Sequence, residues 1–243
     1  MTKINVAICY FGMTRSTKFV YKTHKDHIIN IFKNNDIDYD IYMHTWKTDC
    51  NMIWEKVYNE PVDYSEYKLL NPSIYTIDDQ NEFLKTIDMS HYFDKEKFAQ
   101  YGGNTPHEWH PGLIRNHLCA LESKKRCYNL VLDLHKKYRY IMFVRPDVLV
   151  NNDIDWNMIK KSNFDIIIPN TDHNEGYNDR FAIIPFEKAE KYASRIDEII
   201  DFRKKRGRIV SEKYVKYIID IYYTNVLFMN FNMTIIRPNG QNG

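Results

Sequence analysis

Short apolar runs of strand length alternate along this chain with segments of helical periodicity, and this alternation constrains the fold more than any other feature. The run Ile4–Tyr10 is followed by a helical pattern over Thr17–Phe32 and then by a second short run at Asp40–His44. A strand, a helix and a strand in this order predict a β-α-β unit with a right-handed crossover. Strands that alternate with helices predict an α/β fold, with a mostly parallel central sheet flanked by helices.

The alternation continues through most of the remaining chain. Further strands are predicted at Pro72–Ile77, Tyr140–Val144, Asp165–Pro169, Phe181–Ile184 and Met233–Arg237. Helices are predicted at Leu113–Tyr138, from Ala189 to Ile200, and from Ser211, whose hydroxyl is expected to cap its helix. Asp153 and Asp155 favour a helix start over a metal site. Residues 47–110 give little pattern apart from the strand at 72–77.

Length and charge limit the class of protein. A chain of 243 residues predicts one large domain, 1–243. The net charge of +2, from 34 basic and 32 acidic residues, argues against a nucleic-acid partner, and Arg203–Arg208 is expected to be a solvated helix end. No segment has the ~20 apolar residues of a membrane span. Four cysteines without metal-ligand spacing indicate a reducing compartment, so a soluble cytoplasmic protein is expected.

Polar residues gather just after the predicted strands, where open α/β sheets bind their ligands. This set suits an anionic, phosphate-bearing ligand and a divalent cation. It comprises Phe11, Gly12, Arg15, His44, Trp46, Arg145, Asp147 and residues 170–179. The sequence has no G-x-G-x-x-G, no G-x-x-x-x-G-K-[ST] and no G-x-S-x-G, which argues against a dinucleotide fold, a P-loop and a serine hydrolase.

Asp147 allows two interpretations. A carboxylate directly after a buried strand can hold Mg²⁺ or Mn²⁺ against a pyrophosphate. It can equally pair with Arg145 or cap the turn after Pro146. His107 and His110 flank Glu108 in a pattern only loosely similar to a metal triplet, and a loop over the active site is favoured over zinc there.

Several segments, in order, resemble the GT-A-type glycosyltransferases, in particular a group of small bacterial and large-DNA-virus enzymes thought to build surface glycans. The similarity covers nearly the whole chain and is weakest between residues 50 and 105. Its segments are Gly12-Met13-Thr14-Arg15, Asp40-Ile41-Tyr42-Met43-His44-Thr45-Trp46, Arg145-Pro146-Asp147 and Asn178-Asp179-Arg180-Phe181-Ala182.

The resemblance implies transfer of a sugar from a nucleotide-sugar donor, of the UDP or GDP type, to a glycan or glycoprotein acceptor with help from Mn²⁺ or Mg²⁺. Residues 1–150 would form the nucleotide-sugar-binding half and residues 151–243 the acceptor side. The turn from Gly12 to Arg15 would line the nucleotide pocket, and Asp147 would be the metal carboxylate. The nucleotide-binding residues implied are Phe11, Gly12, Arg15, His44, Trp46, Arg115, Arg145 and Asp147. A viral member would work in the host cytoplasm.

Two departures from the family pattern concern the metal. Arg145 replaces the first carboxylate of the Asp-x-Asp motif, and a guanidinium there can itself neutralise a diphosphate. No histidine follows His173, so the late metal ligand of this fold is missing unless His173 substitutes. Metal binding is therefore expected to be weak or dispensable.

Asp179 is the candidate base that deprotonates the acceptor hydroxyl, with Glu212 in reserve. Asp179 is almost as well explained as a residue that orients a loop or binds acceptor hydroxyls. Trp46, Trp109 and Tyr177 are candidates for stacking on a sugar or base. The competing hypothesis is a non-catalytic nucleotide-sugar or glycan-binding module, and an RNA-binding protein is a weaker third.

Overall fold

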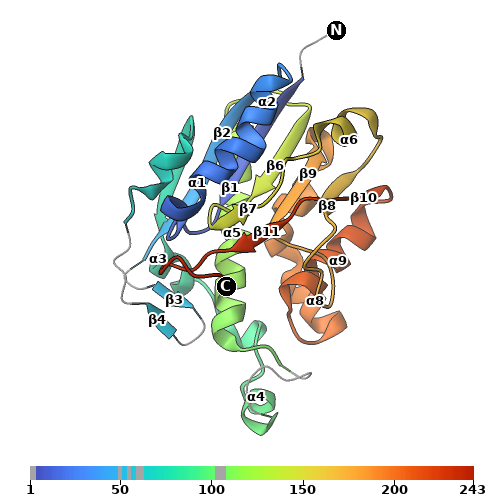
Figure 1. Ribbon diagram of the computed structural model, residues 1–243. Helices are drawn as coiled ribbons and strands as arrows, with labels where there is room; N and C mark the ends of the chain where they lie inside the picture. Colours follow the sequence, from blue (N-terminus) through green and yellow to red (C-terminus); the bar gives the residue numbers. More distant parts are fainter. Residues whose placement is uncertain (1–3, 49–50, 54–55, 59–62, 102–107) are drawn as a thin grey trace.

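A seven-stranded sheet forms the centre of the molecule. The computed structural model describes the chain except for residues 1–3, 49–50, 54–55, 59–62 and 102–107. The strand order is β10-β8-β9-β6-β1-β2-β5 (Figure 1). The strands are β1 (Asn5–Phe11), β2 (Asp38–Lys47), β5 (Ile74–Asp79), β6 (Tyr140–Val144), β8 (Ile166–Pro169), β9 (Phe181–Pro185) and β10 (Val226–Met229).

The sheet is mostly parallel, as predicted. β1 pairs in parallel with β2 and β6, β2 with β5, and β10 with β8. β9 is the exception, since it pairs antiparallel with both β6 and β8. The parallel arrangement brings the carboxyl ends of β1 and β6 to the same edge of the sheet, where Gly12 and Arg145 follow.

One face of the sheet is covered by the segment that follows β1. The predicted helix over Thr17–Phe32 is confirmed as α1 (Thr17–His24), a π-helical turn (Lys25–Ile29) and α2 (Asn30–Asn34). Alternate residues of β1, including Ile8, pack with this segment and with α6 (Trp156–Lys161) in one apolar cluster. The carboxylate of Asp155 accepts from the Met158 N–H at 2.9 Å, so Asp155 caps α6 as expected.

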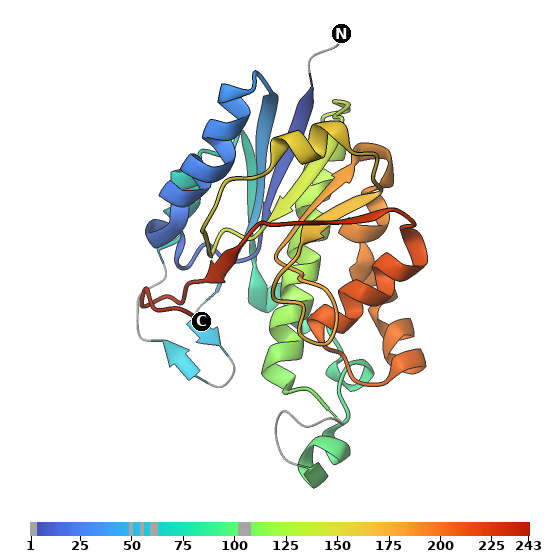
Figure 2. The same cartoon turned by 45° about the vertical axis from the view of Figure 1, so that its right-hand side comes forward.

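The opposite face is covered by α5 (Pro111–Asp133) and by the helices near the carboxyl end (Figure 2). The intervening residues of β1, such as Cys9, pack here with Tyr128 of α5, Tyr192 of α7 (Glu190–Ala193) and Val215 of α9 (Ser211–Tyr222). Both faces of the sheet are thus buried, which explains the continuous apolar runs of its central strands. α5 ends five residues before the predicted Tyr138, after which Leu134 and His135 turn the chain.

The single helix expected from Ala189 to Ile200 is wrong. The chain forms α7, a 3-10 helix (Arg195–Glu198) and α8 (Ile199–Arg206). The carbonyl of Tyr192 accepts a hydrogen bond from the buried Arg195 guanidinium at 2.8 Å, and the Arg195 carbonyl accepts one from the Tyr214 hydroxyl. These side chains occupy carbonyls at the break, and the apolar periodicity does not reveal them.

One further prediction is corrected. Ser211 does not cap its helix: Val210 is the N-cap residue, and the Ser211 hydroxyl donates to the Glu212 carboxylate at 2.6 Å. The last predicted strand is confirmed as β11 (Met233–Ile235), which lies outside the central sheet and pairs antiparallel with β7 (Val148–Val150). That pairing carries the closing segment across to the ends of β1 and β6 (Figures 1 and 2).

The remaining elements lie around these layers. They are β3 (Asn51–Ile53), β4 (Lys56–Tyr58), α3 (Gln80–Lys85), α4 (Lys95–Tyr101) and short 3-10 helices at Glu66–Leu70, Met89–His91 and Phe186–Lys188. None of the described helices is long and apolar enough to span a membrane. Cys9, Cys119 and Cys127 are buried free thiols, and Cys50 lies outside the described residues.

Candidate active site

A pocket of about 200 Å³ opens at the carboxyl ends of β1 and β6. It is formed by the turn after β1, the residues after β6, one side of α5, the loop between β8 and β9, the start of α9 and the end of β11. Its lining residues are Phe11, Gly12, Met13, Arg15, Trp46, Gln80, Trp109, Leu113, Asn116, His117, Cys119, Ala120, Arg145, Asp147, Asp179, Arg180, Ser211, Glu212, Ile235 and Arg237.

Asp147 is held by arginines. The Arg145 guanidinium donates from Nε to Asp147 Oδ1 at 2.8 Å and from Nη2 to Oδ2 at 2.6 Å, and Arg15 Nη2 lies 3.5 Å from Oδ2. The Asp147 side chain is 2% exposed. Burial alone would raise its pKa, but Arg145, Arg15 and Arg237 lower the pKa below the usual range. Asp147 is therefore an ionised carboxylate within a cluster of guanidinium groups.

The backbone around Asp147 is fixed from two directions. The Asp147 carbonyl accepts from the Ile236 N–H at 2.9 Å, and the Pro146 carbonyl accepts from the Thr17 hydroxyl at 3.2 Å. The Ser16 hydroxyl donates to the Ile236 carbonyl at 2.8 Å. The turn after β1, the end of β6 and the end of β11 are thus tied together, which places Arg237 beside the residues after β6.

Gly12 makes the turn at the end of β1. Its φ of +103° lies in a region that other residues rarely adopt, and its N–H donates to Ser123 Oγ of α5 at 2.7 Å. The Ser123 hydroxyl donates to the His44 carbonyl at 2.9 Å and lies 2.8 Å from His44 Nδ1. The buried His44 ring is not part of the pocket lining; it joins β2, α5 and Asp78 behind the pocket.

Of the other predicted aromatic and basic residues, some line the pocket and some do not. Trp46 and Trp109 line the pocket, whereas Arg115 of α5 does not, although the next residue of the helix, Asn116, does. Tyr177 also lies outside the lining, with its ring against His173 and Phe228.

Besides Asp147, two carboxylates lie in the same pocket, Asp179 from the loop between β8 and β9 and Glu212 from the start of α9. Burial alone would raise the Asp179 pKa, but His117, Arg145, Lys124 and Arg195 together lower the pKa below its usual value. The Glu212 pKa is raised, first by burial and then by the charge of Asp179. The pair therefore separates into an ionised carboxylate and one that holds its proton more readily.

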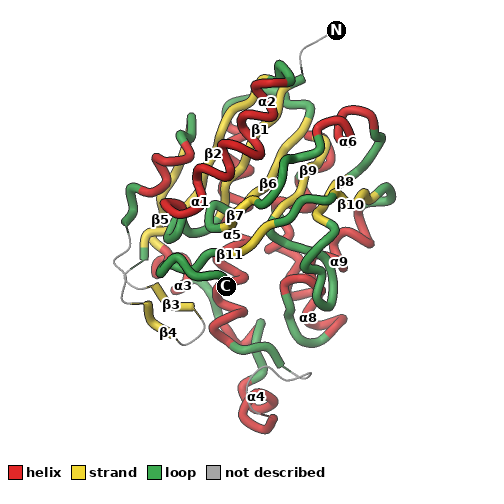
Figure 3. Tube along the Cα trace, viewed as in Figure 1, coloured by secondary structure: helices red, strands yellow, loops and turns green. Residues whose placement is uncertain are grey.

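Glu212 also anchors the loop that carries Asp179 (green in Figure 3). Its carboxylate accepts from Asn174 Nδ2 at 3.1 Å, and its carbonyl accepts from the Tyr177 N–H at 3.0 Å. Gly176 lies so close that a Cβ there would overlap the Glu212 carbonyl.

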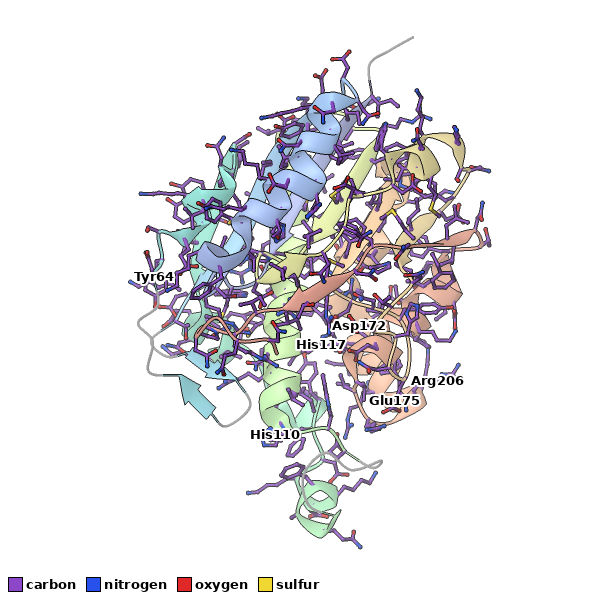
Figure 4. All side chains as sticks on the ribbon, in the orientation of Figure 1. Tyr64, His110, His117, Asp172, Glu175 and Arg206 are labelled. Carbon is purple, nitrogen blue, oxygen red and sulfur yellow. The ribbon has the colours of Figure 1, made fainter. Side chains whose placement is uncertain are left out.

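His117 of α5 forms part of the pocket wall and was not predicted (Figure 4). Its Nδ1 lies 4.0 Å from Asp179 Oδ2, and burial lowers its pKa to about 3, so the ring is neutral at physiological pH. Lys124, two turns further along the same helix, is buried over the rings of Phe11 and Tyr192 at 4.2 and 4.4 Å. Burial lowers the Lys124 pKa well below its usual value.

The described residues do not fit a divalent metal. Arg145 engages both oxygens of Asp147, and no group of three His, Cys, Asp or Glu side chains in the described parts of the chain could hold an ion. His173 does not replace the missing ligand, because its Nδ1 accepts from the Asn178 N–H at 3.3 Å and the residue is not part of the pocket.

Other candidates for binding have structural partners. Glu108 is buried and receives two hydrogen bonds from Arg203, at 2.9 and 2.7 Å, while His110 Nδ1 accepts from the Gly112 N–H at the start of α5 (Figure 4). His107 lies outside the described residues. Arg208 pairs with Glu175 at 2.6 Å, so both ends of the basic run 203–208 are engaged in ion pairs.

Pocket residues that the sequence did not indicate come mainly from helices and from outside the central sheet. They are Gln80, Leu113, Asn116, His117, Cys119, Ala120, Arg180, Ser211, Ile235 and Arg237. Arg180 and Arg237 could have been predicted from the sequence, because they lie in the segment Asn178–Ala182 and in the predicted strand Met233–Arg237. His117 gave no signal, since one histidine within a helical pattern is usual.

No protein-family model matches the chain, and no curated protein matches its sequence. Among solved structures, the chain is similar to an active-site mutant of LgtC, a galactosyltransferase, with a TM-score of 0.45 at 7% identity over 93% of this chain and 72% of LgtC. It is similar to the glycosyltransferase GlyE of Streptococcus pneumoniae TIGR4, with a TM-score of 0.43 at 8% identity over 93% of this chain and 45% of GlyE. It is also similar to mouse xyloside xylosyltransferase 1, with a TM-score of 0.42 at 10% identity over 94% of this chain and 85% of the mouse protein. All three are glycosyltransferases by name, and at these scores the likeness transfers no residue, donor or acceptor to this chain.

Proposed function

We propose that this protein is a glycosyltransferase that moves a sugar from a nucleotide-sugar donor, of the UDP or GDP type, to a glycan or glycoprotein acceptor. The observation that carries the proposal is that four guanidinium groups and three carboxylates line one pocket at the carboxyl ends of β1 and β6. Arg180 is paired with Asp172 and Asp147 with Arg145. Arg15, Arg145 and Arg237 supply the positive side, and Asp179 and Glu212 supply the negative side. A sugar transfer that inverts configuration uses both kinds of charge.

The positive side suits the leaving group. When the bond between the anomeric carbon and the phosphate oxygen breaks, its electron pair stays on that oxygen and the nucleoside diphosphate gains negative charge. Fixed cationic donors aimed at developing charge lower the barrier without having to reorganise. Arg145 and Arg15 are already oriented by Asp147, and planar guanidinium groups match phosphate oxygens.

The negative side suits the acceptor. In a direct displacement the acceptor hydroxyl gives its proton to a carboxylate while its oxygen forms the new bond to the anomeric carbon. Asp179 is our candidate for that base. Asp147 is held by Arg145, and of Asp179 and Glu212 it is Asp179 whose pKa is lowered and which is therefore ionised. Glu212 remains the reserve. Trp46 and Trp109 are candidates for stacking on the base or a sugar ring.

The two halves expected from the sequence both contribute. Arg15 and Arg145 come from residues 1–150, and Asp179 and Glu212 come from residues 151–243. Arg237 belongs to the second half but adds to the positive side. We therefore propose that Arg15 and Arg145 belong to a donor-binding half and that Asp179 and Glu212 belong to an acceptor-binding half. Arg237 is the exception to this division.

A non-catalytic nucleotide-sugar-binding module is the second candidate. The observation that favours it is the pairing of Asp147 with Arg145, which leaves the aspartate of the expected metal motif without a metal-binding role. Both candidates bind a donor, and only the transferase breaks the bond between the sugar and the diphosphate.

Thermal melting with a panel of nucleoside diphosphates and nucleotide-sugars tests the donor site. A ligand at 100 times its Kd should stabilise the folded protein by about 2.7 kcal/mol, which a melting curve resolves. We expect a shift with one nucleotide base and a smaller shift in Arg145→Gln. If no nucleotide changes the melting temperature, the donor-site assignment is wrong.

A further inference from the structure

The phosphate side of the pocket is built around a carboxylate that already has its cations. Each Asp147 oxygen accepts from Arg145, at 2.8 and 2.6 Å, and Oδ2 has Arg15 3.5 Å away. A divalent ion that coordinated Asp147 would have to displace a two-pronged ion pair at a side chain that is 2% exposed. It would also stand beside several guanidinium groups of like charge.

Arg145 has N–H groups that do not bind Asp147 and that can donate to a ligand. A guanidinium carries five N–H groups, and Asp147 uses one on Nε and one on Nη2. Nη1 donates to none of the described residues, the side chain is 22% exposed, and the residue lines the pocket. Arg145 can therefore hold Asp147 with one edge and offer the other edge to phosphate oxygens.

The three arginines and Asp147 together carry the same net charge as a divalent cation. Arg15, Arg145 and Arg237 contribute three positive charges and Asp147 one negative charge, which leaves two positive charges. A divalent cation brings the same charge to a diphosphate. The three guanidinium groups, however, are attached to the protein and come from different elements: the turn after β1, the end of β6 and the residues after β11.

Building on the proposed function, we propose that Arg145, Arg15 and Arg237 bind and neutralise the donor diphosphate without a divalent cation, and that Asp147 is a positioning residue for Arg145 and Arg15. The aspartate that resembles a metal ligand thus serves to orient arginines. Asp147 does not touch the diphosphate, since its two oxygens face the guanidinium groups.

Isothermal titration of the wild-type protein with UDP and with GDP tests this directly. One set of titrations contains EDTA and the other contains Mn²⁺ or Mg²⁺. We expect the nucleotide that binds to have the same Kd in both, within about twofold. Binding that weakens tenfold or more in EDTA overturns the arginine site and leaves the proposed donor pocket standing. If neither nucleotide binds in either buffer, both proposals are wrong.

Two substitutions at position 145 sharpen the test. Arg145→Lys keeps the positive charge but removes the planar guanidinium group with its paired N–H donors. We expect at least a tenfold loss of nucleotide affinity that a divalent metal does not restore. Arg145→Asp creates a second carboxylate after β6, separated from Asp147 by Pro146 alone. We expect this variant to bind the nucleotide weakly in EDTA and to recover nucleotide affinity in Mn²⁺. Retention of wild-type affinity by both variants in EDTA contradicts the proposal.

Arg208→Gln is the matched control. Arg208 also makes two short hydrogen bonds to one carboxylate, that of Glu175, but it does not line the pocket. We expect its nucleotide affinity to equal that of the wild type. Melting curves of all variants check folding, and the comparison of buffers in the wild-type protein does not depend on any variant.

Discussion

At the scale of single residues, Asp179 and Glu212 are two carboxylates of one pocket whose surroundings move their pKa values in opposite directions. The nearby His117, Arg145, Lys124 and Arg195 outweigh the effect of burial on Asp179, whereas burial and the Asp179 charge raise the pKa of Glu212. Environments that separate two acids in this way commonly give them different roles.

This separation predicts unequal effects of two isosteric substitutions. Asp179→Asn should lower turnover by about 10²–10⁴-fold, the usual contribution of a general base, with donor affinity unchanged. Glu212→Gln should lower turnover much less. Steady-state kinetics paired with donor titrations measure both quantities. Equal losses of turnover in the two variants contradict the assignment of Asp179 as the base.

Glu212 also predicts a pH-dependent stability difference. A carboxyl whose folded pKa is raised favours folding below its unfolded value, near 4.5, and this contribution is lost as the pH rises through the folded pKa. Glu212→Gln should therefore unfold at higher urea concentration than the wild type at pH 8. At pH 4 the difference should shrink toward zero. An equal difference at both pH values argues against a raised Glu212 pKa.

At the scale of elements, the loop between β8 and β9 depends on its contact with the start of α9. Gly176→Ala should push this loop away from Glu212, since the new Cβ overlaps the Glu212 carbonyl, and should thereby displace Asp179. We expect lower melting temperature together with lower turnover. Gly207→Ala is the control: its φ of +83° also strains alanine, but no atom lies within 4 Å of the new Cβ. It should lower stability alone, and a similar loss of turnover in both variants contradicts the role of the loop.

The same scale shows what sequence could and could not predict. The strands Asn5–Phe11 and Tyr140–Val144 were predicted because helices cover both of their faces, so nearly every residue is apolar. The position of Met233–Ile235 was not predictable, because a short apolar run does not say which strand it pairs with. The helix from Ala189 is interrupted where the Tyr192 and Arg195 carbonyls accept hydrogen bonds from the Arg195 and Tyr214 side chains, and apolar periodicity does not reveal such bonds. The site was predicted in part: the residues that follow strands, such as Arg145 and Asp147, were predicted. Of the residues on helices, Glu212 was predicted and His117 was not.

At the scale of the whole molecule, three buried histidines predict loss of stability in acid. Burial lowers the pKa of His24 to about 4, of His44 to about 4 and of His117 to about 3. The unfolded chain binds protons at these positions below about pH 6.5, whereas the folded protein does not. The free energy of unfolding should therefore fall as the pH drops from 6.5 toward 4, by up to about 1.4 kcal/mol per pH unit for each histidine. Urea unfolding across this range tests the slope, and a flat profile down to pH 5 contradicts it.

The pocket joins segments from the first strand to the last, so its chemistry is a property of the whole chain. Release of nucleoside diphosphate from a panel of UDP- and GDP-sugars, with and without a glycan acceptor, tests the central claim most directly. We predict release from one donor, slow without acceptor, faster with it, and at least about 100-fold slower in Asp179→Asn. A donor that stabilises the protein against melting yet stays intact under every condition contradicts sugar transfer and identifies a binding module.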